Sequence, residues 1–99
     1  MNIDIQSHAS TAAQADHAKR QIRFALTRHS NRIQRILVRL GDVEGRRGSP
    51  ANYCRIRVEM IDAQPVDSLD TGADLYDVID RAVGRAARAV VRQKRSLGH

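Results

Sequence analysis

The sequence has little cysteine and no long apolar run, and these absences exclude several classes of protein. Cys54 is the only cysteine, so neither an intramolecular disulfide framework nor a zinc site built on a cysteine cluster can form. A reducing cytoplasm suits such a chain. The N-terminus lacks the basic start and apolar segment of a signal peptide, and nowhere do about 18 apolar residues follow one another. We therefore expect a soluble, cytoplasmic protein that does not bind membranes.

Acidic residues are missing from two long stretches of the chain. None occurs between Lys19 and Arg39, a segment with seven Lys and Arg residues, and none follows Asp80. Over all 99 residues, 17 Lys and Arg exceed 11 Asp and Glu, which gives a net charge of +6. This imbalance puts nucleic acid and anionic membranes ahead of acidic small molecules as partners, and of these nucleic acid is the one we expect. The length is sufficient for one domain with a modest core and too short for two.

Residues 2–33 predict a strand followed by a helix. Ile3 and Ile5 alternate with polar neighbours, the period-two pattern of a short, half-buried strand. Ser10 or Thr11 can cap the next segment, in which apolar residues recur at helical spacing. These apolar positions are Ala15, Ala18, Ile22, Ala25, Leu26 and Ile33. The basic residues on the remaining circumference are Lys19, Arg20, Arg23 and Arg28.

Residues 36–60 predict two strands joined by a long loop. Ile36, Val38 and Leu40 recur at every second position, as in a strand, and the segment 41–52, GDVEGRRGSPAN, has the glycines and proline of a loop. The strand 53–60 alternates most clearly. Its expected inward residues are Cys54, Ile56, Val58 and Met60, and its outward residues are Tyr53, Arg55, Arg57 and Glu59. Cys54 is then a small apolar core residue rather than a nucleophile.

The last third of the chain predicts an edge strand and a second helix. Pro65 and several polar residues make the segment 65–71 a weak strand, suited to a sheet edge. Gly72 ends it, and Asp74 is placed to cap the helix or to lie in its first turn. The apolar stripe of that helix is Leu75, Ile79, Ala82, Val83, Ala86 and Val90.

The resulting order of elements is β-α-β-β-β-α. It predicts an α+β fold in which two helices pack on one face of a four-stranded, mostly antiparallel sheet, while the other face is open to water. The basic sides of both helices then belong to one layer and can form a continuous positive face.

Arginines recur along the last helix at spacings of four and three residues, which keeps them in one stripe of a helix with about 3.6 residues per turn. They are Arg81, Arg85, Arg88, Arg92 and Arg95. Neighbouring like charges of this kind repel by about 0.2–0.5 kcal/mol per pair. A polyanionic partner would offset that cost, although such stripes are more often merely solvated surface.

The segment 72–80, GADLYDVID, resembles the signature of the family of ribosome hibernation promoting factors and ribosome-associated translation inhibitors. An Asp-x-Tyr-x-x-Ile-Asp segment opens the second helix in that family, and it is met here by Asp74, Tyr76, Ile79 and Asp80. The family has the same order of elements, and the similarity covers essentially all 99 residues. One departure is Asp70, which stands where the family's fourth strand usually turns a small apolar residue inward.

The resemblance implies a translation inhibitor that binds rRNA of the small ribosomal subunit, in the channel that mRNA and tRNA would otherwise occupy, and so promotes hibernation under stress or in stationary phase. It assigns rRNA contacts to Arg85, Arg88, Arg92 and Lys94. Arg81 and Arg95 are candidates from helical spacing alone, and the first-helix candidates Lys19, Arg20, Arg23 and Arg28 from charge alone. It implies no cofactor, no metal and no catalytic residue.

The resemblance is to the short members of that family. Residues 1–99 are expected to form a single ribosome-binding domain that acts as a monomer, without the C-terminal dimerisation domain of long members. Pairing of ribosomes would then require a separate dimerising factor.

Three alternatives stay open at the level of sequence. The chain can be a generic basic RNA-binding domain that does not act on the ribosome, or a protein-interaction module that uses the open sheet face. A small enzyme would need titratable groups that converge on a pocket, and no motif supplies them. No two of the four histidines have the four-residue spacing of a helical metal site.

Phe24 falls on the polar side of the first helix, between Arg20 and Arg28. An aromatic ring in that position can stack on an unpaired base, or it can be partly buried in the protein.

Overall fold

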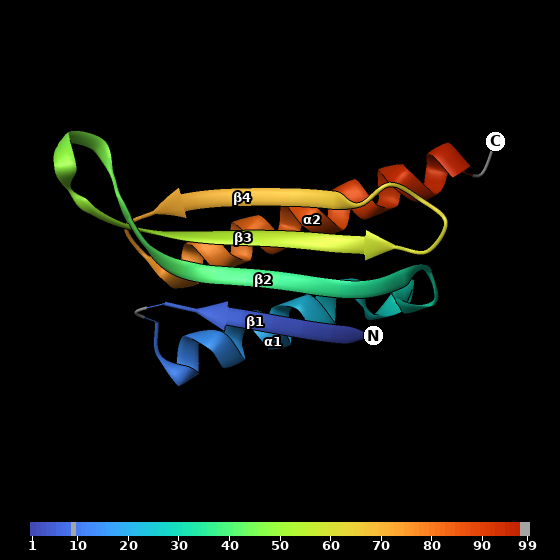
Figure 1. Cartoon of the computed structure of the whole chain (residues 1–99), viewed down its shortest axis with the longest axis horizontal. Coiled ribbons are helices and arrows are strands. Elements are labelled where there is room, and N and C mark those ends of the chain that lie inside the picture. The colour runs from blue at the N-terminus through green and yellow to red at the C-terminus, as the bar shows by residue number, and fades with distance from the viewer. Residues whose placement is uncertain (9, 98–99) are drawn as a thin grey trace.

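The structure is a computed structural model that describes residues 1–8 and 10–97, with side chains described through Gln93. Figure 1 shows one sheet with two helices on the same side of it. The elements are β1 (Asn2–Ser7), α1 (Ala12–Leu26), the 3-10 segment η1 (Thr27–Arg32), β2 (Ile33–Glu44), the 3-10 turn η2 (Arg46–Gly48), β3 (Pro50–Met60), β4 (Val66–Gly72) and α2 (Leu75–Leu97). The strand order is β1-β2-β3-β4, with β1 parallel to β2 and the other pairs antiparallel. The predicted fold class is confirmed.

The core lies between the sheet and the helix layer. Inward residues of β2 and β3, such as Ile36, Ile56 and Val58, are fully buried, as their period-two spacing predicted. Ile22 of α1 and Ile79 of α2 meet them from the helix layer. Burial of each such side chain stabilises the fold by about 1.5–3 kcal/mol. In the part of the chain that the structure describes, no helix is long and apolar enough to cross a membrane.

The first helix is shorter than its apolar spacing suggested. Thr11 provides its N-cap: its Oγ1 accepts from the Gln14 N–H at 3.2 Å, and Gln14 Oε1 accepts from the Thr11 N–H at 2.8 Å. The helix ends at Leu26, and η1 follows. Ile33, predicted on the helix, instead begins β2 opposite Met60. The prediction was wrong because Ile33 follows Leu26 by seven positions, a spacing that also corresponds to about two helical turns.

The loop between β2 and β3 is also shorter than the predicted segment 41–52. The ladder runs to the pair Glu44 and Pro50, so that only residues 45–49 form the turn. Gly41 lies within the sheet opposite Tyr53, and a Cβ added to it would lie 2.9 Å from Tyr53 Cε1. Because Gly41 has no side chain, it leaves room for the Tyr53 ring, and the strand continues through it.

The last strand and helix lie where the sequence placed them. β4 is an edge strand, as β1 is on the other side of the sheet, and Asp74 Oδ1 accepts from the Tyr76 N–H at 2.9 Å, so Asp74 caps the start of α2. All six residues of the predicted apolar stripe are buried. Val78, which the stripe omitted, is fully buried as well, because the start of α2 is covered by both the sheet and α1.

Candidate nucleic-acid interface

The two helices are joined at the signature segment by a polar contact and an aromatic contact. His17 Nε2 of α1 lies 2.8 Å from Asp80 Oδ1 of α2. The ring of His17 also meets the ring of Tyr76 edge-on, with centroids 5.0 Å apart. Three of the four signature residues therefore shape the helix layer directly: Tyr76 and Asp80 bind α1, and Ile79 is buried in the core.

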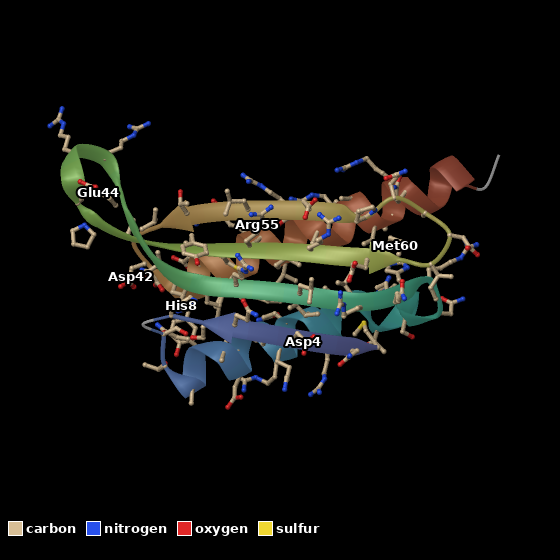
Figure 2. All side chains as sticks on the ribbon, in the orientation of Figure 1. Asp4, His8, Asp42, Glu44, Arg55 and Met60 are labelled. Carbon is tan, nitrogen blue, oxygen red and sulfur yellow. The ribbon has the colours of Figure 1, made fainter. Side chains whose placement is uncertain are left out.

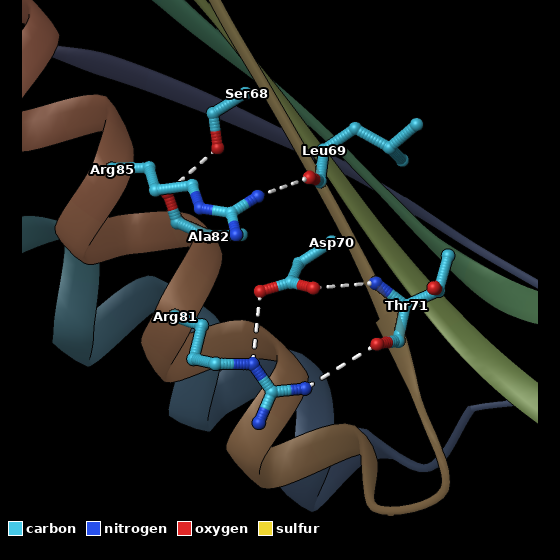
Figure 3. Close-up of polar contacts among 7 residues, drawn as sticks. All are labelled: Ser68, Leu69, Asp70, Thr71, Arg81, Ala82 and Arg85. Atoms are coloured by element: carbon cyan, nitrogen blue, oxygen red, sulfur yellow. Dashed lines mark hydrogen bonds and ion pairs between the residues drawn. The ribbon is translucent and has the colours of Figure 1, made fainter.

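The first two arginines of the α2 stripe lie against β4 (Figure 3). Arg81 donates from Nε to Asp70 Oδ2 at 2.9 Å and from a terminal nitrogen to the Thr71 carbonyl at 3.3 Å. Arg85 donates to the Leu69 carbonyl at 3.1 Å. Arg81 thus forms an ion pair with Asp70, while Arg85 forms none but lies near enough for its charge to act on the same carboxylate.

The carboxylate of Asp70 is held ionised by these neighbours. Burial alone would raise its pKa, but hydrogen bonds from Arg81 and from the Thr71 N–H, together with the charges of Arg81 and Arg85, lower the pKa below its usual value of 3.8. Asp70 therefore has a structural role, because it turns inward and fixes Arg81 on β4.

Cys54 faces the same layer, opposite Asp70 in the β3–β4 ladder. Burial, and then the nearby charge of Asp70, raises the pKa of its thiol to about 12. A thiol in this state is unreactive at neutral pH, in accord with the prediction of a core residue.

Arg88 and Arg92 are the exposed cations farther along α2. Within the described residues, neither forms a hydrogen bond or ion pair. The Arg88 guanidinium extends back over Gly84, where an added Cβ would lie 3.5 Å from one of its terminal nitrogens. The side chains of Lys94 and Arg95 lie outside the described residues. The free positive charge of the described helix is therefore concentrated at Arg88 and Arg92.

The basic side of the first helix is divided between two elements. Arg20 and Arg23 are exposed on α1 and Lys19 is half-buried, whereas Arg28 lies on η1 rather than on the helix as predicted. Phe24, among these residues, is 86% exposed. The possibility of partial burial is thereby removed, and an aromatic ring stands in water beside several cations.

Two features of this layer were missed by sequence reasoning. His17 appeared as one of several scattered histidines, and its pairing with Asp80 joins residues 63 positions apart. Ser68, buried on β4, donates to the Ala82 carbonyl at 2.7 Å and ties the strand to α2. Strand alternation places Ser68 on the same inward face of β4 as Asp70, but it does not predict the contact of Ser68 with Ala82 on α2.

Together these features define an α+β domain whose layer of two helices carries uncompensated cations and an exposed aromatic ring, the surface chemistry of a polyanion-binding module. No family model matches the chain, and no curated protein matches it by sequence.

Solved structures do resemble this one. The N-terminal domain of Protein Y from Thermus thermophilus is 23% identical, with a TM-score of 0.66 over 93% of this chain and 98% of that one. A ribosomal subunit interface protein from Coxiella burnetii is 9% identical, with a TM-score of 0.70 over 100% of both chains. The chain therefore shares the fold of these two proteins.

Proposed function

We propose that this protein is a non-enzymatic, ribosome-associated translation inhibitor that acts in the cytoplasm. It binds rRNA of the small ribosomal subunit in the mRNA and tRNA channel and promotes hibernation by excluding those RNAs. The likeness of the whole fold to a ribosomal subunit interface protein supports this proposal, as does the signature at residues 74–80.

The observation that carries the proposal is the pair Arg88 and Arg92, one helical turn apart on α2 and without partners in the described structure. Guanidinium groups bind phosphate through paired N–H donors, so two free arginines at this spacing suit successive phosphates of an RNA strand. Arg20 and Arg23 of the neighbouring helix extend the same layer. Arg85 donates one hydrogen bond to the Leu69 carbonyl and contacts the RNA with its remaining N–H donors. Arg81 is paired with Asp70 and mainly stabilises the fold.

Steric exclusion is sufficient for the mechanism. A rigid domain held by several phosphate contacts occupies the channel without bond making, cofactor or metal. The protein acts as a monomer, and pairing of silenced ribosomes is the task of a separate dimerising factor.

Cosedimentation with purified small subunits, large subunits and whole ribosomes across a salt series tests this function. We expect saturable binding near one copy per small subunit that mRNA and initiator tRNA displace. An Arg88→Gln/Arg92→Gln variant should lose most of this binding, and the charge-matched Arg46→Gln/Arg47→Gln variant, altered in the η2 turn, should keep it. Binding without saturation or preference for a subunit would contradict the proposal and leave a generic basic RNA-binding domain.

A further inference from the structure

Two arginines face each other at the centre of the open sheet face. Arg39 of β2 lies directly opposite Arg55 of β3 in the register, and both side chains are exposed. Figure 2 looks onto this face and shows Arg55 above β3, with the helices behind the sheet. Like charges placed directly opposite one another destabilise a strand pair. The arrangement weakens the two central strands unless an anion lies between the guanidinium groups.

The neighbouring arginines of the same face show the contrast. Arg35 is 2.6 Å from Glu59, its cross-strand partner, and Arg57 is 3.2 Å from Asp67 on β4. Among the described residues, Arg39 and Arg55 have no such partner. Asp4 of β1 lines an adjoining hollow with Arg39 but forms no ion pair with it. Both ion pairs lie toward the Ile33 and Met60 ends of β2 and β3, and the next pair along the strands, Arg39 and Arg55, is left free.

A hollow of about 200 Å³ lies over this pair, lined by Leu37, Arg39, Arg55 and Arg57. Since a water molecule takes about 30 Å³ of the liquid, the hollow can hold a phosphate group with part of its sugar. Leu69 of β4 lies opposite Arg55 and is 55% exposed. Tyr53 lies on β3, two residues from Arg55. Flat apolar and aromatic surface therefore adjoins the cations.

We propose that the open sheet face binds a single-stranded RNA segment, with Arg39 and Arg55 donating to its phosphates and the flanking Leu37, Tyr53 and Leu69 supporting its bases. Charge complementarity favours an anion, and the apolar surface beside the two arginines favours one with stackable bases over an acidic peptide. This surface lies on the side of the sheet away from α1 and α2, so the domain has two RNA-binding faces and can be held between two RNA segments. RNA binding by the sheet face is independent of ribosome binding by the helix layer; only the holding of the domain between two RNA segments rests on the proposed function.

Fluorescence anisotropy of a labelled ten-nucleotide oligouridylate with the full chain tests this face. We expect Arg39→Gln/Arg55→Gln to weaken binding at least tenfold and to reduce the slope of log affinity against log salt by about 1.4, since each lost phosphate contact contributes about 0.7. The Arg46→Gln/Arg47→Gln variant has the same net charge and should bind nearly as well as the parent. Equal losses in the two variants would show only a net-charge effect and overturn the proposal.

A second variant separates lost binding from lost folding. Arg55→Glu places a carboxylate opposite Arg39, so it should raise the urea midpoint while binding of the oligouridylate falls below detection. Parental affinity in a folded Arg55→Glu variant would overturn the proposal. So would displacement of the RNA by polyglutamate at concentrations at which polyuridylate is ineffective, because the face would then prefer an acidic protein.

Bridging distinguishes the two faces. Biotinylated oligouridylate should capture small subunits through the parent protein, but not through Arg39→Gln/Arg55→Gln, which lacks the sheet contacts, or through Arg88→Gln/Arg92→Gln, which lacks the helix contacts. Loss of small-subunit binding in the helix variant, with oligouridylate affinity for the sheet unchanged, supports both proposals. If the sheet variant retains parental oligouridylate affinity, only the sheet proposal fails; if the parent does not cosediment with small subunits, only the ribosome proposal fails.

Discussion

Arg81 of α2 donates to Asp70 of β4 at 2.9 Å, and this contact divides a regular arginine stripe into a part that serves the fold and a part that is free. Gly72 gives the guanidinium room, since a Cβ there would lie 2.8 Å from its terminal nitrogen. The Asp70 side chain is only 13% exposed, so the contact joins β4 to α2 in a partly desolvated position.

The stripe should therefore respond unequally to substitution. Arg81→Ala should destabilise the domain by about 1 kcal/mol, because it leaves Asp70 without its partner. Arg88→Ala and Arg92→Ala should change the free energy of unfolding by less than about 0.5 kcal/mol and should each lower the affinity for small subunits severalfold. Urea unfolding and cosedimentation of the three single variants measure both effects. Equal loss of stability at all three positions would contradict the division.

Acid should weaken the contact between β4 and α2. The pKa of Asp70 is lower in the folded state than its usual value, so the ionised carboxylate stabilises the fold fully at neutral pH. This contribution is lost as the pH falls from about 4 through the folded-state pKa. The stability difference between the parent and Asp70→Asn should accordingly be present at pH 7 and shrink at pH 3.

An Asp42→Asn variant is the control for this measurement, because Asp42 is an exposed carboxylate at the end of β2 (Figure 2). Its unfolding free energy should stay close to the parent's at both values of pH. A parent–Asp70→Asn difference that grows on acidification would refute the assigned role of the ion pair.

The buried face of α2 should not tolerate charge. Ile79 is fully buried among the sheet and both helices, and Ile79→Asp would place an unpaired carboxylate there. We expect the variant to be unfolded at neutral pH by circular dichroism. Ile79→Val, which removes one methylene, should cost about 0.5–1.5 kcal/mol and stay folded. A soluble, folded Ile79→Asp protein would disprove the packing described for this helix.

Phe24 should matter for binding and not for folding. Because its ring is 86% exposed, Phe24→Ala should leave the urea midpoint nearly unchanged. If the ring stacks on an unpaired base, the substitution should cost about 1–3 kcal/mol of binding to small subunits. Ile61→Ala, at an exposed apolar side chain in the turn before β4, is the matched control. Unchanged affinity after Phe24→Ala would exclude a stacking role.

Much of the fold was predictable because side-chain alternation is a local property. Ile36, Val38 and Leu40 predicted the inward face of β2, and the stripe from Leu75 to Val90 predicted the buried face of α2. The predictions failed at boundaries. Ile33 continued the helical spacing across η1, and the glycines of residues 41–52 suggested a long loop where the strands in fact remain paired.

The sequence predicted that the helix layer is positively charged, but it did not predict which of its arginines are free of ion pairs within the domain. Helical spacing predicted that Arg81, Arg88 and Arg92 share one side of α2, and the structure agrees that all three are exposed. Helical spacing could not reveal that Arg81 is paired, because its partner Asp70 lies on β4 and not on the helix.

By itself, the sequence determined the order of the elements, the buried side of each and the excess of positive charge, because these depend on neighbours within about two helical turns or a few strand positions. The tertiary structure decided which cations are free. Pairing of Arg81 with Asp70, and the unpaired opposition of Arg39 and Arg55, depend on how α2 docks on β4 and on the register of β2 with β3. Contacts of that kind are set by the packing of the whole domain, since a shift of one residue turns every strand side chain to the other face.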